Sequence, residues 1–257
     1  MRQFYLLICV LSISLMHAQN DSIYFWKTGV LLEKRSIKTT DLDSITFKRP
    51  TPAFVTICNQ IWSTKNLDVS TYSDGTPIPQ VTDPTAWANL TTGAWCFSDN
   101  DPANGAVYGK LYNWYAAAGI YDAASLADPT LRKKLARTGW HVPTDAEWST
   151  LINCADPNAN GGHTIPNIAG DMMKSTTLWT PFSSITNTNS SGFTGLPGGD
   201  RLYNGTFLVI GLTGYWWSSS ENSTTAAWYR TLYYNYSSAA RTSNYKTSGF
   251  SVRCVRD

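Results

Sequence analysis

The chain has 257 residues, of which 13% are aromatic and 15% are charged, against about 25% charged residues in ordinary globular proteins. Its 20 basic and 18 acidic residues give a net charge of +2, which offers little attraction for nucleic acid or an anionic membrane. Solubility must therefore come from Ser, Thr and Asn, a balance that suits an exported protein.

The first residues predict a secretory signal peptide. Arg2 precedes an apolar run from Phe4 to Met16, and the small residue Ala18 follows. The run is shorter than the roughly 20 residues that a membrane-spanning helix needs. We expect cleavage after residue 18, no membrane span, and export to the periplasm, the cell surface or the medium. Without residues 1–18 the chain has 19 basic residues (20 − 1) and 18 acidic ones, a net charge of +1.

A short leader is expected between the signal peptide and the main domain. Residues 21–49 alternate apolar runs with Thr-Gly and Thr-Thr-Asp, a pattern that predicts two or three strands. Pro50 and Pro52 then interrupt the chain. The expected units are a strand-rich leader over residues 19–50 and a main domain over residues 51–257.

The main domain is expected to mix short strands with helices. FVTICNQIW, residues 54–62, predicts a β-rich opening segment. Within residues 107–119, Leu111, Trp114 and Ala118 recur at helical spacing before Gly119, which predicts one continuous helix. Residues 157–206 are rich in Asn, Gly and Ser and predict long loops with a short helix near 168–174.

Strands are expected again toward the C-terminus. They are predicted in three aromatic-rich stretches, which are YWWSSS (215–220), AAWYRTLYY (226–234) and FSVRCVR (250–256). In the last stretch Phe250, Val252 and Cys254 share one face, the period of a half-buried strand.

GWHVPTDAEW, residues 139–148, places two carboxylates one residue apart among aromatic residues. Thr144 followed by Glu147 matches a capping box, in which each side chain bonds the backbone near the other, and an apolar helical stretch follows at once. Residues two apart on a helix do not face each other, whereas glycosidases need carboxyl groups that converge across the sugar. Asp145 and Glu147 are therefore interpreted as a helix start and not as a catalytic pair.

Aromatic residues offer the best candidate ligand contacts. Tyr229, Tyr233, Tyr236 and Trp217 could stack on sugar rings, because an aromatic face is a large, rigid apolar surface with a polar tip. The alternative is that alternate rings fill the core, which is where large aromatic side chains usually lie.

The loop DNDPANG, residues 99–105, offers oxygen ligands for calcium from Asp99, Asn100, Asp101 and Asn104. The spacing is not that of an EF-hand, and Asp and Asn commonly stabilise turns through bonds to nearby backbone. We favour the turn, and we expect no cofactor, with calcium as the alternative.

Five motifs resemble those of the Fibrobacter succinogenes major paralogous domain family, over about residues 54–257. They are AWCFSDNDPANGAVYGKLYNWYAAAG (94–119), GWHVPTDAEW (139–148), SSGFTGLPGGDR (190–201), GYWWSSSENSTTAAWYRTL (214–232) and SGFSVRCVRD (248–257). The resemblance implies a class of domain and supplies no mechanism.

The order of these motifs is also similar, more distantly, to that of formylglycine-generating enzymes. That similarity implies an α+β, C-type-lectin-like domain with two main helices, short antiparallel sheets and long loops. The paired active-site cysteines of those enzymes are absent from residues 215–221, so their activity is not implied.

Four cysteines remain after processing, which predicts disulfides with three possible connectivities. Cys96 and Cys254 lie within the family-like motifs, so the resemblance favours that pair. Cys58 with Cys254 is the alternative that the lectin-like architecture implies, because its first and last strands are neighbours.

Taken together, these features favour an exported, non-catalytic binding or adhesion module that contacts a glycan or a surface protein. The alternative is an exported polysaccharide hydrolase in which Glu221 and Asp200 form the acid pair. Mutual proximity of these two carboxyl groups in one cleft would favour the hydrolase.

Overall fold

The computed structural model describes residues 22–27, 30–36, 53–208 and 210–257. The chain divides into two units, residues 1–50 and residues 51–257. In the first unit, β1 (Ser22–Lys27) and β2 (Val30–Ser36) pair as an antiparallel hairpin. The predicted signal peptide, residues 1–18, lies outside the described residues.

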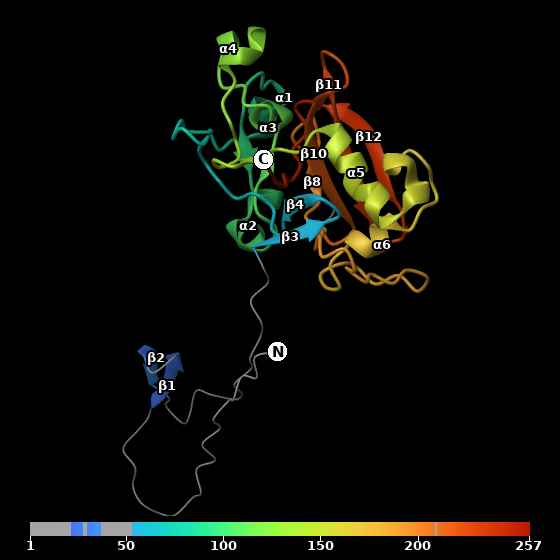
Figure 1. The fold of residues 1–257 in the computed structure, drawn as a ribbon. Coiled ribbons are helices and arrows are strands. Elements are labelled where there is room, and N and C mark those ends of the chain that lie inside the picture. Colours follow the sequence, from blue (N-terminus) through green and yellow to red (C-terminus); the bar gives the residue numbers. More distant parts are fainter. Residues whose placement is uncertain (1–21, 28–29, 37–52, 209) are drawn as a thin grey trace, which may run out of the picture. The chain divides into compact units, whose positions relative to one another are not determined.

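The second unit contains two larger antiparallel sheets (Figure 1). The first has the order β3-β4-β13-β7 and comprises β3 (Phe54–Ile57), β4 (Gln60–Ser63), β13 (Val255–Arg256) and β7 (Trp140–His141). The second has the order β10-β11-β12 and comprises β10 (Thr213–Glu221), β11 (Ala226–Tyr233) and β12 (Ala239–Tyr245). Because β4 pairs with β13, the two ends of this unit meet in one sheet.

Two short strand pairs complete the described sheets. They are β5 (Trp95–Cys96) with β6 (Leu111–Tyr112), and β8 (Asp200–Arg201) with β9 (Phe207–Leu208). The strands predicted near residues 54–62, 215–220 and 226–234 are confirmed. Strand β12 was missed, because its sequence AARTSNY has no clear apolar alternation.

The helices are short and most begin at a capping side chain. They are α1 (Pro84–Ala88), α2 (Pro102–Tyr108), α3 (Trp114–Ala117), α4 (Ala123–Ala127), α5 (Asp145–Ala155) and α6 (Ala169–Met173), with 3-10 turns η1 (Ser98–Asn100), η2 (Pro129–Leu131) and η3 (Pro157–Gly162). At α5 the Thr144 side chain accepts from the Glu147 backbone and the Glu147 side chain accepts from the Thr144 backbone, so the predicted capping box is confirmed. The short helix expected near 168–174 is confirmed as α6.

The continuous helix predicted over residues 107–119 is wrong. Helix α2 ends at Tyr108, and Gly109 follows with φ 77°, a left-handed conformation that ends the helix. Strand β6 comes next, and Asn113 then caps α3 by accepting from the Ala116 backbone. Leu111 and Trp114 are both buried, which gives the sequence an apolar pattern like that of a helix. They belong to different elements, β6 and α3.

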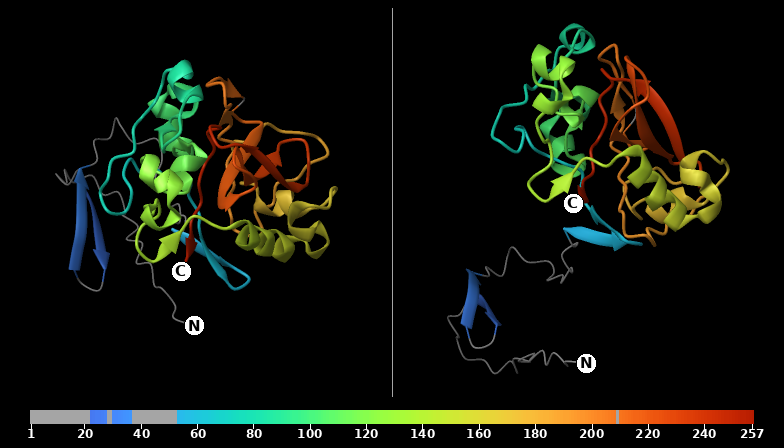
Figure 2. Two further views of the ribbon diagram at one scale, coloured as in Figure 1. Left: turned by 90° about the horizontal axis from the view of Figure 1, so that it is seen from above. Right: turned by 45° about the horizontal axis from the view of Figure 1, so that its top comes forward.

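The β10–β12 sheet has a hydrophobic cluster on each face. Trp216 and Trp217 are adjacent on β10 and both fully buried, because successive side chains of a strand point to opposite faces. Trp216 packs in one cluster with Trp148 of α5, and Trp217 packs in the other with Trp114 of α3. Figure 2 shows α5 lying beside this sheet, with the C-terminal segment running between the sheet and the helices of residues 84–127.

The C-terminal segment is buried on both sides and is not half-buried as predicted. Ser251 and Arg253 are as buried as Phe250 and Val252. The Arg253 guanidinium donates to Asn66 Oδ1 and to the backbone oxygens of Ser63, Phe193 and Thr194, at 2.7 to 2.8 Å. These bonds offset the cost of burying the charge, which a sequence pattern does not reveal. Among the described residues there is no helix of sufficient length and apolarity to cross a bilayer.

Candidate functional site

The two carboxylates of GWHVPTDAEW point to different partners. Asp145 accepts from Arg230 at 2.7 Å and from Arg241 at 2.8 Å, which joins α5 to β11 and β12. Glu147 accepts from the Thr144 backbone and from His141 Nε2, both at 2.8 Å. The pKa of Asp145 lies below its usual value: partial burial would raise that pKa, and the bonds from both arginines outweigh it. Both carboxylates have structural partners, as the sequence predicts.

Glu221 and Asp200 are not brought together. Gly199 bridges to Gly214 near the start of β10, whereas Glu221 ends that strand. Asp200 therefore lies beside the start of β10, and Gly214 in that strand is seven residues before Glu221. Since a strand rises about 3.3 Å per residue, roughly 20 Å separates Asp200 from Glu221. Asp200 is buried, which raises its pKa to about 7. Glu221 is exposed and accepts from Lys246 Nζ at 2.9 Å. This arrangement does not suit an acid pair acting on one glycosidic bond.

Two of the four aromatic candidates belong to the core. Trp217 is fully buried and Tyr229 is 7% exposed. Both pack against Phe250, with ring centroids 4.3 and 4.7 Å from that ring. The prediction that Trp217 and Tyr229 contact ligand is therefore corrected, because the C-terminal segment covers this face of the sheet.

The other two candidates meet at the surface. Tyr233 and Tyr236 line one cavity of about 130 Å³ together with Ile165, Ser238 and Ala240; we call it the tyrosine pocket. The two tyrosine rings lie 6.0 Å apart in an edge-to-face arrangement. Tyr236 is 56% exposed and Ile165 is 58% exposed. Their apolar surfaces are therefore open to a ligand.

Two buried polar side chains hold the tyrosine pocket in shape. Lys174 Nζ donates to the carbonyl oxygens of Tyr233 at 3.2 Å and Tyr236 at 2.8 Å. On the other side, Asn167 bonds both backbone groups of Ala239 at 3.0 Å, which fixes the loop that carries Ile165. Neither residue was singled out from the sequence. A lone lysine after a short helix and an asparagine in a polar loop carry no local signal of such bonds.

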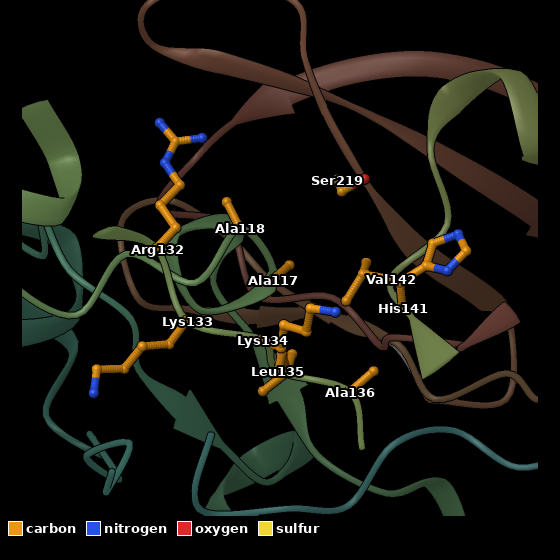
Figure 3. Close-up of a pocket in the computed structure, with 10 residues that line it drawn as sticks. All are labelled: Ala117, Ala118, Arg132, Lys133, Lys134, Leu135, Ala136, His141, Val142 and Ser219. Carbon is orange, nitrogen blue, oxygen red and sulfur yellow. The ribbon is translucent and has the colours of Figure 1, made fainter. Parts of the chain in front are cut away.

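A second cavity, of about 300 Å³, lies between the end of α3, residues 132–136 and β10; we call it the basic pocket (Figure 3). Its lining residues are Ala117, Ala118, Arg132, Lys133, Lys134, Leu135, Ala136, His141, Val142 and Ser219. No local pattern in the sequence indicates this pocket, because residues 132–136 approach α3 only in the folded chain. Gly119, at φ 79°, allows this approach, since a Cβ atom there would overlap the Lys133 carbonyl.

The loop proposed for calcium has local roles. Asp101 caps α2 by accepting from the Ala103 backbone at 2.8 Å, and Asn104 donates to the Ser98 carbonyl at 3.1 Å. Asp99 lies in the 3-10 turn η1 with φ 55°. In the part of the chain that the structure describes, no group of three His, Cys, Asp or Glu side chains is placed to hold a metal ion.

The disulfide joins Cys58 to Cys154, so both predicted pairings are wrong. Cys58 lies in the turn between β3 and β4, and Cys154 lies near the end of α5. Cys96 and Cys254 are free and buried in separate hydrophobic clusters. The pairing depends on how the first hairpin packs against α5, which motif membership does not show.

Comparison with known proteins identifies the family and no close relative. Neither the curated proteins nor the solved structures contain a match to this chain. The family model described as the Fibrobacter succinogenes major domain matches residues 55–256. That range contains both pockets and the disulfide. The chain therefore belongs to the Fibrobacter succinogenes major domain family.

Proposed function

We propose that the domain is an exported, non-catalytic binding module that contacts a glycan through the tyrosine pocket. One observation carries this proposal: Tyr233 and Tyr236 present two rings at a surface cavity, with Tyr236 more than half exposed. Sugar rings have apolar C–H faces that pack on the faces of aromatic side chains.

The rigidity of the tyrosine pocket supports the same proposal. Lys174 is fully buried and bonds the backbone of both tyrosines, and Asn167 fixes the opposite wall. A preformed site loses less side-chain and loop entropy on binding, so weak stacking contacts yield more net affinity.

Export and a C-type-lectin-like architecture are part of the proposal. The signal-like N-terminus and the disulfide both fit an oxidising compartment. Short helices, small antiparallel sheets and paired terminal strands fit a lectin-like scaffold.

The test is binding of the chain lacking residues 1–18 to a panel of plant, host and bacterial polysaccharides, with calcium present. We expect saturable binding to a subset without loss of polymer length. Tyr236→Ala should weaken that binding about tenfold, since a lost aromatic contact is worth roughly 1 to 1.5 kcal/mol.

Tyr203→Ala is the matched control. Tyr203 is 50% exposed but lies after β8 and contacts Tyr245, outside the tyrosine pocket. Equal losses in both variants would contradict the assignment of the site. Absence of binding to every polysaccharide would contradict a glycan ligand and favour a surface protein.

A further inference from the structure

The basic pocket combines an apolar floor with polar groups at its rim. The floor consists of small or aliphatic side chains, which are Ala117, Ala118, Leu135, Ala136 and Val142. Arg132, His141 and Ser219 lie around it, and the Lys134 side chain extends across it toward Val142 (Figure 3). Its volume of about 300 Å³ is at the lower end of the range for small-molecule sites. Such a cavity suits one ring-sized group that carries an anionic substituent.

The three consecutive basic residues at positions 132–134 have different roles. Lys133 points away from the cavity in Figure 3 and bonds Asp74 at 2.5 Å and Thr76 at 2.6 Å. Lys134 is exposed and its side chain extends toward Val142. Among the described residues, no hydrogen bond or ion pair of the Lys134 ammonium group is found.

Arg132 lies on the other side of the cavity and is only loosely held. Its Nη2 atom is 3.9 Å from Glu221 Oε1, and its Nε atom is 3.4 Å from the Ser125 carbonyl oxygen. Both distances are at the outer limit for such interactions, so the guanidinium can take a closer anionic partner. Arginine suits this role because its planar donors match the two oxygens of a carboxylate.

His141 closes the pocket without supplying a free charge. Its Nδ1 and Nε2 atoms bond Asp257 at 2.7 Å and Glu147 at 2.8 Å. The available positive charge therefore comes from Arg132 and Lys134. The Ser219 hydroxyl adds a neutral hydrogen-bonding group at the rim.

We propose that the basic pocket binds a carboxylate-bearing sugar, such as a uronic acid residue of a polysaccharide. Arg132 and Lys134 supply the positive charge that attracts the carboxylate, the apolar floor packs under a C–H face, and Ser219 bonds a hydroxyl. The choice of a sugar over an acidic peptide rests on the proposed glycan-binding function. The pocket is a second site, separate from the tyrosine pocket, and it gives the module a preference for acidic polymers.

The test compares trigalacturonate with its methyl ester, which has the same sugar rings without the charges. Calorimetric titration of the chain lacking residues 1–18 should show that the acid binds at least about tenfold more tightly than the ester, because charge-assisted bonds are among the stronger hydrogen bonds. Lys134→Gln and Arg132→Gln should each remove about tenfold of the affinity for the acid and leave the affinity for the ester unchanged.

Lys133→Gln is the matched control. It removes one positive charge, as Lys134→Gln does, but the Lys133 side chain points away from the basic pocket. We expect it to leave trigalacturonate binding unchanged. Equal losses in Lys133→Gln and Lys134→Gln would overturn the proposal by showing general attraction to surface charge. Equal affinity for acid and ester would overturn it as well.

Two further readouts separate this inference from the proposed function. Tighter, Lys134-dependent binding of a glutamate-rich peptide than of trigalacturonate would overturn the choice of a sugar. Binding of neutral polysaccharides and its loss in Tyr236→Ala are measured independently. If those results hold while Lys134→Gln has no effect, the basic pocket proposal fails and the tyrosine pocket proposal stands.

Discussion

At the scale of single residues, several cations act as structural links in the interior. Arg201, Arg230, Arg253 and Lys174 are fully buried, and each bonds backbone or carboxylate oxygens. Arg230 depends on Asp145, which also binds Arg241. The residue that first suggested catalysis thus connects α5 to two strands of the β10–β12 sheet.

Replacement of Asp145 is expected to destabilise the fold. Asp145→Ala leaves the Arg230 guanidinium buried without a carboxylate, and breaking a buried ion pair in this way costs about 3 kcal/mol. Urea denaturation should show this loss in the free energy of unfolding.

Asp128→Ala is the control, since Asp128 is exposed and caps only the 3-10 turn η2. We expect its denaturation midpoint to stay close to that of the unmodified chain. A similar midpoint for Asp145→Ala would show that the buried arginines do not depend on this carboxylate.

At the scale of elements, α5 is anchored at both ends. Its first turn bonds β7 through Glu147 and His141, and its last turn is joined to the β3–β4 turn by Cys58–Cys154. The start of α5 was predictable because its cap involves residues three apart. The 107–119 segment was not, because β6 pairs with β5 and Tyr112 bonds the backbone of Phe250.

Removal of the disulfide should lower stability without changing the fold. The linked cysteines are 96 residues apart, and a closed loop of that length restricts the unfolded chain by up to about 4 to 5 kcal/mol. The double variant Cys58→Ser, Cys154→Ser should therefore unfold at lower urea concentration, with Asn59→Ser in the same turn as control.

Thiol counting checks the pairing directly. Burial raises the pKa of Cys96 and of Cys254 to about 12, so neither thiol should react in the native protein. After denaturation of the chain lacking residues 1–18 without reductant, we expect two reactive thiols, those of Cys96 and Cys254. Four reactive thiols would contradict the Cys58–Cys154 bond.

In the second unit as a whole, His141 joins the neighbouring segments β7 and α5 to Asp257, which is 116 residues away in the sequence. It belongs to β7, and its ring bonds Asp257 at the chain end and Glu147 in the first turn of α5. Since β13 also pairs with β4 and β7, the bonds of His141 stabilise the β3-β4-β13-β7 sheet, in which the first and last strands of the unit meet.

This cluster should make stability depend on pH. Partial burial lowers the pKa of His141, but its bonds to Asp257 and Glu147 outweigh burial and raise that pKa above 6.5. The protonated ring therefore contributes fully below pH 6.5, and this contribution is lost as pH rises through the raised pKa.

Glu147 sets the acidic limit of this stabilisation. Partial burial would raise its pKa, but the bonds from Thr144 and His141 hold that pKa below 4.5. The contribution of Glu147 to stability is therefore lost as pH falls through the lowered pKa.

Urea midpoints of the unmodified chain should exceed those of His141→Gln at pH 5.5 and converge with them at pH 9. His163→Gln, which replaces an exposed imidazole, should follow the unmodified chain at every pH. A constant difference would contradict the role of protonation.

The sequence alone determined the features that depend on neighbours a few residues away. The capping box of Thr144 and Glu147, helix α6 and the strands around Trp216 and Trp228 follow from local bonding and alternation. The family motifs were also readable, and the match over residues 55–256 confirms the family.

Features that require distant partners depend on how the chain packs in three dimensions. Tyr229 and Tyr236 are seven residues apart and equally aromatic, yet Phe250 covers the first ring, whereas the second is 56% exposed. Likewise, Cys58 meets Cys154, although 96 residues separate them in the sequence. Lys134 approaches Val142 at the basic pocket because the two segments that carry them pack together in the fold. The burial of a side chain is set by the segment that packs on it. The sequence next to that side chain does not indicate which segment this will be.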